Sequence, residues 1–211
     1  MSVKDTAGDH EHCERRRHRR RVLWSISLFI VVVLLVVFLV WLILRPTKPS
    51  FYLQDARVLN LNLSQPNFLS TTIQVTISSR NPNEHVGVFY DRLNIYAVYK
   101  SQQITPAVEL PPFYQGHKDV DVWSPYLSGF FVPIAPYLCT NLLLDEAGGT
   151  IFLDVKIDGR VRWKVGDWTS DRYHIYVDCP AFLSFDGSSG GGTGDAPIIR
   201  FQQLSACSVE V

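Results

Sequence analysis

One uninterrupted apolar stretch, Val22 to Leu44, constrains this chain of 211 residues more than any other feature. Its only hydroxyl side chains are Ser25 and Ser27. As an α-helix it would be about 35 Å long, enough to cross a hydrocarbon layer of about 30 Å. Backbone amides inside lipid have no water to bond, so a spanning segment must be helical even where it is rich in β-branched residues. The sequence therefore predicts one transmembrane helix over 22–44.

Basic residues flank this stretch unequally and predict its orientation. Six arginines lie within 15–21, whereas only Arg45 and Lys48 follow closely. Because basic flanks stay on the cytosolic side, we expect a cytosolic N-terminus and an exterior C-terminal part. A cleaved signal peptide is the alternative, but its apolar region would be about 7–15 residues long and would end in a small-residue cleavage site. The longer stretch and the missing site favour an uncleaved signal anchor.

The formal net charge of zero hides two differently charged parts. Residues 1–21 carry seven Lys or Arg and four Asp or Glu, and they predict a disordered basic cytosolic tail. Residues 45–54 predict a short linker, stiffened by two prolines. Residues 55–211 are long enough for one domain with its own core. Residues 49–211 carry eleven basic and sixteen acidic residues, a balance that argues against a nucleic-acid partner.

Apolar and polar residues alternate along most of the exterior part. Residues 59–63 and 73–77 show the pattern clearly, and further short runs follow between turn signals rich in Gly, Pro and Asn. This period of two is typical of half-buried strands. We expect Asp158-Gly159 to form a hairpin turn between two such runs. About eight short antiparallel strands predict an all-β sandwich behind the single transmembrane helix.

Residues 130–144 are apolar but contain two prolines, so they are too short and too interrupted to span a membrane. We expect a short helix over 135–144 that closes one end of the β domain and stops near Gly148-Gly149. An interfacial segment that touches the outer leaflet is the alternative, although the basic residues typical of such helices are missing. The glycine-rich run 186–195 predicts a flexible loop. It lacks the Gly-Lys-Ser/Thr ending of a phosphate-binding loop.

Cysteines and one sequon bear on the compartment. Cys13 is expected to be a cytosolic thiol, either without a role or palmitoylated. Three cysteines lie in the oxidising compartment, and we expect Cys179 to pair with Cys207, because both lie near the ends of late strand-like runs. Asn62-Leu63-Ser64 is a glycosylation sequon whose Asn62 falls on the polar side of its strand, so a glycan there would point to solvent.

Several motifs together resemble one plant family. The basic tail and spanning helix precede a characteristic set of segments: Asn81-Pro82-Asn83, Tyr90-Asp91, Arg162-Trp163-Lys164 and the ending Cys207-Ser208-Val209-Glu210-Val211. This order resembles the plant harpin-induced-like (NHL) proteins of the late-embryogenesis-abundant group 2 (LEA-2) superfamily. The resemblance implies a fibronectin-III-like sandwich, residence in the plasma membrane as a type II protein, and association with plant defence and hypersensitive responses. It implies no enzymatic activity.

Residues suited to catalysis or metal binding are scattered in the exterior part. His85, His117 and His174 are isolated in the sequence, and neither G-x-S-x-G nor H-E-x-x-H occurs. Asp119 and Asp121 share a strand face, which favours a solvated edge over a weak cation site. A tract of metal-ligand residue types, 9–13, lies in the flexible tail. We therefore expect no enzyme, no cofactor and no resident metal.

Two functions remain open from the sequence. The exterior domain is expected to be an interaction module of plant defence that binds a protein or cell-wall partner. Arg162 and Lys164 share one face of their strand, a pattern that favours a solvated sheet face over a binding surface. The alternative is a structural protein that protects the membrane–wall interface during desiccation or other abiotic stress. The sequence fixes neither the partner nor the oligomeric state.

Overall fold

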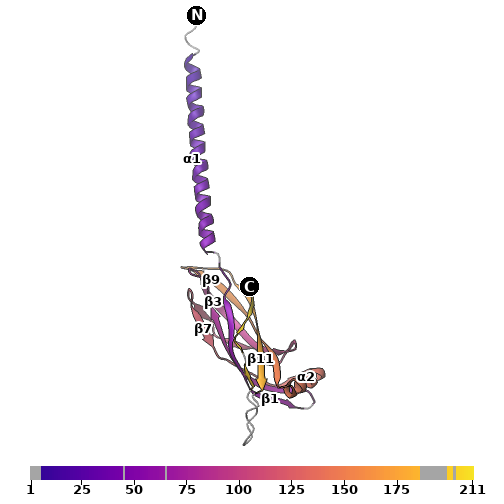
Figure 1. The fold of residues 1–211 in the computed structure, drawn as a ribbon. Coiled ribbons are helices and arrows are strands. Elements are labelled where there is room, and N and C mark those ends of the chain that lie inside the picture. The colour runs from indigo at the N-terminus through magenta and orange to yellow at the C-terminus, as the bar shows by residue number, and fades with distance from the viewer. Residues whose placement is uncertain (1–5, 45, 65, 186–198, 202) are drawn as a thin grey trace. The chain divides into compact units, whose positions relative to one another are not determined.

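The computed structural model describes residues 6–44, 46–64, 66–185, 199–201 and 203–211 (Figure 1). The chain divides into two compact units between residues 45 and 46. The N-terminal unit is a single helix, and the C-terminal unit contains all strands and a second helix. The glycine-rich run 186–195 lies outside the described residues, as do the side chains of 9–13, including the thiol of Cys13.

Helix α1 (Thr6–Leu44) contains the predicted spanning segment. From Arg19 to Leu39 it is long and apolar enough to cross a membrane, and the side chains there are exposed in the isolated chain. Because α1 begins at Thr6, the structure differs from the disordered tail predicted over 1–21. Ala, Glu and Arg favour helix, and extending an existing helix needs no new nucleus.

Fourteen strands form one antiparallel, hydrogen-bonded network in the described part of the C-terminal unit. The strands are β1 (Ser50–Ser64), β2 (Phe68–Arg80), β3 (Gly87–Tyr99), β4 (Gln102–Gln103), β5 (Val108–Leu110), β6 (Phe113–Gln115), β7 (Val120–Trp123), β8 (Tyr126–Pro133), β9 (Thr150–Val165), β10 (Trp168–Thr169), β11 (Tyr173–Phe185), β12 (Ile199–Phe201), β13 (Ser205–Ala206) and β14 (Ser208–Glu210). The alternating residues predicted as strands therefore lie in strands.

The strand order folds this network into two layers. β3, β9 and β11 are neighbours in one layer, and β1 pairs with β2, which pairs with β7 and β8, in the other. β12 bonds both β11 and β1 and so joins the layers along one side. The inward faces share one apolar cluster that draws on both layers. This confirms the predicted fold class, an antiparallel β-sandwich preceded by one apolar helix.

The first strand begins earlier than the sequence predicted. β1 starts at Ser50, and Phe51 and Leu53 are 1% and 0% exposed in the shared core. Burying two large apolar side chains favours folding by several kcal/mol, at about 25 cal/mol per Å² of apolar area. The compact unit therefore starts at Pro46, and half of the predicted linker 45–54 is strand.

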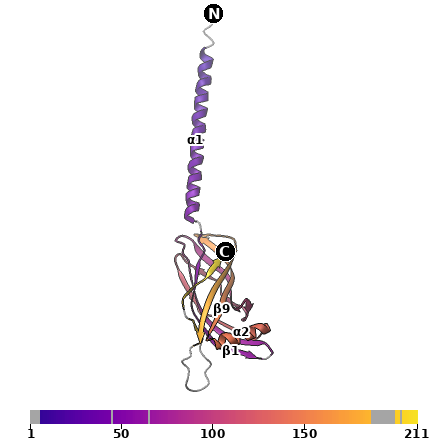
Figure 2. The ribbon, with the colours of Figure 1, turned by 45° about the vertical axis from the view of Figure 1, so that its right-hand side comes forward.

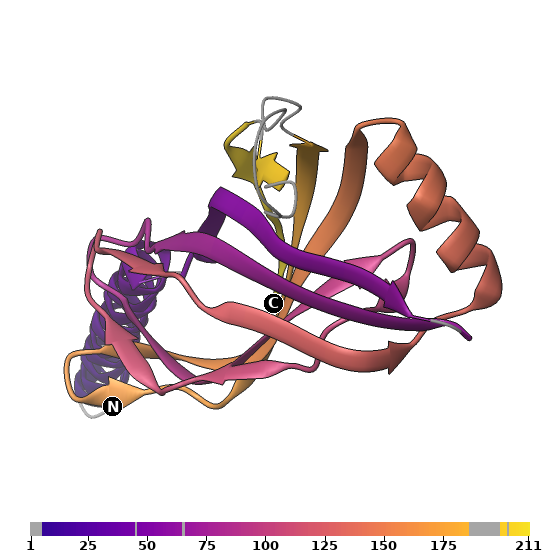
Figure 3. The ribbon, with the colours of Figure 1, turned by 90° about the horizontal axis from the view of Figure 1, so that it is seen from below.

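Helix α2 (Pro136–Ala147) agrees with the short helix expected over 135–144. Pro136 occupies its first turn, where a missing N–H costs nothing, and the N–H of Gly148 closes its end by donating to the carbonyl of Leu144 at 2.8 Å. Leu138 and Leu142 are buried. The helix lies beside one end of the strands (Figures 2 and 3).

Asp158-Gly159 is not a hairpin turn, and this prediction was wrong. β9 runs straight through both residues, pairing Gly159 with Leu93 of β3 and with Ile175 of β11. A Cβ on Gly159 would lie 2.3 Å from the carbonyl oxygen of Arg92. β3 has a register shift between Tyr90 and Arg92 at this point. Glycine is needed at position 159 because the bulged strand β3 approaches β9 closely there. In the sequence, a glycine with this role inside a strand cannot be told from a glycine in a turn.

Candidate functional site

The segment after β2 is a buried polar corner built on Asn81. Asn81 is 0% exposed. Nδ2 donates to the carbonyls of Val86 and Gly116, both at 2.8 Å, and Oδ1 accepts from the backbone N–H of Asn83 at 3.1 Å. Asn side chains favour such turns because they replace backbone partners. The corner thus ties the start of β3 to the end of β6.

Asn83 extends this corner to the segment that precedes β1. The backbone N–H of Thr47 donates to Oδ1 of Asn83 at 2.8 Å, and Nδ2 of Asn83 donates to the carbonyl of Thr47 at 2.7 Å. One residue later, Nζ of Lys48 donates to the carbonyl of Val209 in β14 at 2.6 Å. The residues that follow the apolar helix in sequence are therefore bonded to the sandwich, Thr47 through its backbone and Lys48 through its own side chain.

Tyr90 lies beneath the corner in a second buried network. Its hydroxyl donates to Oε1 of Gln115 at 3.1 Å and lies 3.0 Å from Oγ of Ser79. Nε2 of Gln115 donates to the carbonyl of Ser79 at 2.8 Å. The ring stacks on Phe113 with centroids 4.5 Å apart. Burial raises the pKa of Tyr90 far above its usual value, so the hydroxyl stays neutral and acts as a structural donor.

Pro82 and Trp163 have structural positions. Pro82 is exposed and lies between the two buried asparagines, where its fixed φ stiffens the corner. Trp163 is 7% exposed and packs in the core. Its backbone exchanges two hydrogen bonds with Ser170, to Oγ at 2.9 Å and from the backbone N–H at 2.8 Å. These bonds close the β9–β10 hairpin.

Asp91 is the centre of an ion cluster on the outward side of the sandwich. Nε of Arg162 donates to both carboxylate oxygens, at 3.0 and 2.9 Å, and Nη2 bonds Oδ1. Nε of Arg172 donates to Oδ2 at 3.1 Å. The Arg162 guanidinium also lies 4.7 Å from the centroid of the Phe89 ring. Two arginines share one carboxylate here, so the cluster keeps an excess positive charge.

Lys164 continues this basic surface along β9. Its Nζ lies 5.3 Å from the centroid of the Tyr114 ring, a cation–π contact. Tyr114 also covers Gly87, where a Cβ would meet the tyrosine hydroxyl at 2.3 Å. The internal motif residues therefore lie in three places: the buried corner with the Tyr90 network, the core around Trp163, and the outward basic face.

Comparison with known proteins places this arrangement in a family. Residues 76–179 match the family model LEA_2, late embryogenesis abundant protein. NDR1/HIN1-like protein 1 of Arabidopsis thaliana is 45% identical over 96% of this chain and 98% of its own length. NDR1/HIN1-like proteins 12 and 26 of the same plant are 44% and 38% identical, over 100% and 95% of this chain and 100% and 96% of their own lengths. The chain belongs to the NDR1/HIN1-like proteins of the LEA_2 family. The predicted resemblance is confirmed.

This NDR1/HIN1-like chain unites motif residues far apart in sequence and adds partners that the sequence did not reveal. Asp91 and Arg162 are 71 positions apart. Thr47, Gln115 and Arg172 complete the corner, the tyrosine network and the ion cluster. None of the three stands in a motif. A polar residue at an inward position, as Gln115 is in its short strand, was the one signal that could have indicated a buried network.

Cysteines of this LEA_2 domain form one disulfide. Cys179 of β11 and Cys207, just before β14, are bonded, and their Cα atoms lie 4.3 Å apart. β13 and β14 are short, so the bond fixes the end of the chain to a central strand. Cys139 is a free thiol buried in α2, where Sγ lies 3.4 Å from Oδ1 of Asn67.

The sequon asparagine Asn62 lies near the end of β1 opposite Ser70 of β2. Its side chain is exposed. An attached glycan needs such an exposed position, because a bulky polar chain cannot be buried. Glycosylation of Asn62 stays a prediction.

Titratable residues considered for catalysis do not converge in the described part of the chain. No group of three or more His, Cys, Asp or Glu side chains there is arranged to hold a metal. His85, His117 and His174 are exposed on separate segments. Burial, and secondly the charge of Asp119, raises the pKa of Asp121. The LEA_2 family is not a known enzyme family.

Proposed function

We propose that this chain is a single-pass plasma-membrane protein with a cytosolic N-terminus, and that its exterior LEA_2 domain is a non-enzymatic interaction module in plant defence. The observation that carries the proposal is the exposed apolar surface of α1 between Arg19 and Leu39. A helix that is apolar all round needs lipid or a protein core around it. The arginine run before it supports the proposed orientation, because basic flanks stay cytosolic.

Two further observations support an interaction module. The bonds from Asn83 and Val209 to the 47–48 segment give the domain a fixed start close in sequence to the helix. The outward face of β3 and β9 carries charged side chains that are exposed or half-buried. Defence is supported by the relatives, which include the Arabidopsis protein named Protein NDR1 at 28% identity over 70% of this chain.

Sealed microsomes containing the full chain test the orientation. Protease added outside should remove only the N-terminal tail and leave a fragment that includes residues 46–211. Glycosidase treatment of that fragment should increase its mobility, and Asn62→Gln should abolish the shift. Digestion of the domain in sealed vesicles, with the tail protected, would contradict the orientation. A protected domain that shows no shift would contradict only the glycan.

The family description, late embryogenesis abundant, favours a second function, protection of the membrane–wall interface during desiccation. Null plants complemented with surface variants separate the two. If the domain is a defence module, charge-neutral variants of its outward face should fail to restore the hypersensitive response while they accumulate normally. If it protects structurally, the same variants should restore dehydration tolerance.

A further inference from the structure

Two arginines face each other across neighbouring strands on the outward side of the sandwich. Arg92 of β3 lies directly opposite Arg160 of β9, and Arg160 lies opposite His174 of β11. All three side chains are exposed. Like charges directly opposite one another on a sheet are destabilising. Arg92 is ion-paired with Glu109, but Arg160 has no ion-pair partner among the described residues, so Arg160 could bind an anion from outside the domain.

The adjacent positions extend this surface, which we call the basic stripe. The basic stripe consists of Arg92, Arg160, Arg162, Lys164 and Arg172. Among the described residues its ion-pair partners are Glu109, which bonds Arg92 at 2.8 Å, and Asp91, which Arg162 and Arg172 share. In the described part of the chain, these five cations thus share two ion-paired carboxylates, and the carboxylate of Asp158 lies two positions before Arg160 on the same face of β9. Lys164 contacts only a tyrosine ring, and Arg160 has no ion-pair partner in the described part of the chain.

The basic stripe has a linear arrangement. Arg160, Arg162 and Lys164 alternate along one face of β9, which spaces them by about 6.7 Å. Such a row suits a chain with repeated charges better than a single compact anion. The Arg162–Asp91 pair shows the two-pronged geometry that a guanidinium offers an acid group, with Nε on Oδ2 and Nη2 on Oδ1, and Arg160 is free to repeat it.

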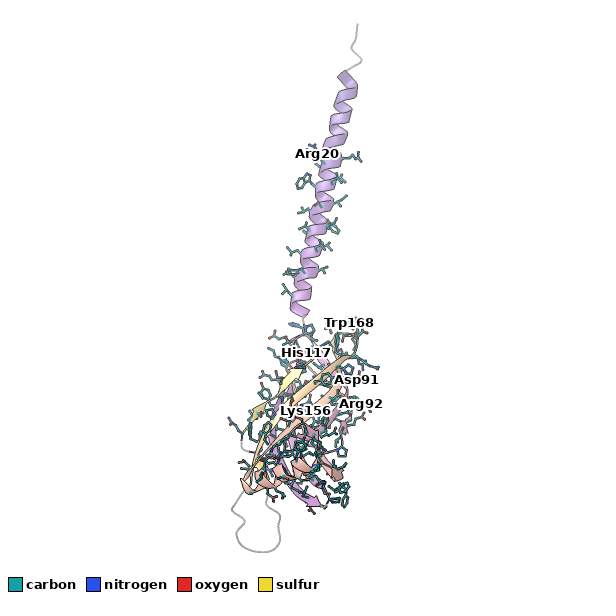
Figure 4. All side chains as sticks on the ribbon, turned by 90° about the vertical axis from the view of Figure 1, so that its right-hand side faces the viewer. Arg20, Asp91, Arg92, His117, Lys156 and Trp168 are labelled. Atoms are coloured by element: carbon teal, nitrogen blue, oxygen red, sulfur yellow. A yellow bond between two sulfur atoms is a disulfide. The ribbon has the colours of Figure 1, made fainter. Side chains whose placement is uncertain are left out.

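A groove lies farther along the same face of β9. It has a volume of about 610 Å³ and is lined by side chains that include Tyr96, Asp154, Lys156, Tyr176 and Asp178. Lys156 and Arg92 mark the two regions in Figure 4. Lys156 and Arg160 are four positions apart, about 13 Å of strand. Tyrosine rings and carboxylate oxygens suit the flat faces and hydroxyl donors of neutral sugars, and the same carboxylates repel anions.

We propose that the basic stripe and this groove together bind a linear polysaccharide that carries both free uronates and neutral sugar units. Free carboxylates bond the guanidiniums of the basic stripe, while uncharged units lie in the groove between Tyr96 and Tyr176. A phospholipid headgroup or an acidic peptide would match the cations but would leave the groove unused. The inference rests on the proposed function, because it needs the domain to face the cell wall.

Full-length protein in phosphatidylcholine nanodiscs tests the proposal with polygalacturonate in three forms: free acid, half methyl-esterified and fully methyl-esterified. The half-esterified form should bind tightest, because only it supplies both kinds of unit. Replacing both Arg92 and Arg160 by Gln should weaken its binding about tenfold, the sum of two modest surface ion pairs. Tyr176→Ala should weaken the half-esterified form and leave the free acid nearly unchanged.

The matched control replaces two cations away from the basic stripe, Arg57→Gln with Lys118→Gln, and should bind like wild type. Arg160→Gln alone should not lower the melting temperature, because it removes a like-charge pair, although it weakens binding. Unchanged binding of the Arg92/Arg160 variant would overturn the proposal. So would equal affinity for polyglutamate or for phosphatidylserine vesicles. The microsome assay is independent, so binding with a cytosolic domain would refute the proposed function and leave this site standing.

Discussion

Asn83 and Thr47 exchange two hydrogen bonds of opposite direction, at 2.8 and 2.7 Å, across 36 positions of sequence. The asparagine amide replaces a strand partner for the backbone of Thr47, and its second Nδ2 bond, to Oδ1 of Asn81 at 2.8 Å, holds the amide in place. The Asn-Pro-Asn motif is therefore more than a turn. It holds in place the residues that lie in sequence between the apolar helix and β1.

Asn83→Ala should lower the free energy of unfolding of the domain by about 2–3 kcal/mol, because each lost bond contributes about 1 kcal/mol. The segment 46–50 should also become sensitive to limited proteolysis. Urea denaturation of the full chain in detergent measures the first effect. Glu84→Gln is the control, since its ion pair with Lys118 joins two exposed side chains. If Asn83→Ala were as stable as wild type, the hydrogen bonds of the Asn83 side chain would contribute little to the stability of the domain.

Gly159→Ala should destabilise the domain by about 3 kcal/mol, because its Cβ would clash with backbone of β3 that cannot move away. Gly116→Ala is the matched control: the nearest atoms to its Cβ lie 3.7 Å away, so the change should stay within about 0.5 kcal/mol. Thermal denaturation of both variants separates the effects. If Gly159→Ala were neutral, the close approach of β3 and β9 would be absent in solution.

The sequence predicted the parts of this fold that depend on local pattern. The apolar run predicted the helix. The alternation of apolar and polar residues predicted the long strands, because one face of each strand packs in a single core. Predictions from local pattern were wrong where contacts with backbone distant in sequence determine the structure. Asp158-Gly159 has the composition of a hairpin turn, and only the bulge in β3, some 70 positions earlier, explains the glycine.

The candidate site shows the same division. The motif residues Asn81, Asn83 and Asp91 could be picked out by resemblance, but their partners could not. Thr47 bonds through its backbone, which leaves no trace in residue type. Arg172 follows a short hairpin, and its approach to Asp91 depends on how β10 turns back on β9. Such contacts depend on how segments distant in sequence are aligned in the fold, and local sequence patterns do not show this alignment.

Replacing Cys179 and Cys207 by alanine should lower the free energy of unfolding by about 3–4 kcal/mol, because the bond closes a loop with a sequence separation of 28. The end of the chain should detach first, since β14 has only three residues. Denaturation of wild type with and without reductant gives the same comparison, and reductant should not affect the double variant. Equal midpoints for all samples would mean that the bond does not form in the cell.

Asp154→Asn should stabilise the domain at neutral pH. Burial, and secondly the charge of Asp178, raises the pKa of Asp154 in the folded state, while Lys156 partly offsets the shift. The folded state therefore holds this proton more tightly than the unfolded chain. That contribution to stability is complete below the unfolded pKa of about 3.9 and is lost as pH rises through the folded pKa.

The melting temperature of Asp154→Asn should accordingly exceed that of wild type at pH 7, and the two should converge near pH 3. Glu109→Gln is a control of opposite sign, because the hydrogen bond from Arg92 lowers the pKa of Glu109. Its stabilisation is present above the unfolded pKa and is lost as pH falls, so this variant should melt below wild type at pH 7. A lower melting temperature for Asp154→Asn at pH 7 would instead place an unseen cationic partner beside Asp154, within the groove proposed to hold neutral sugars.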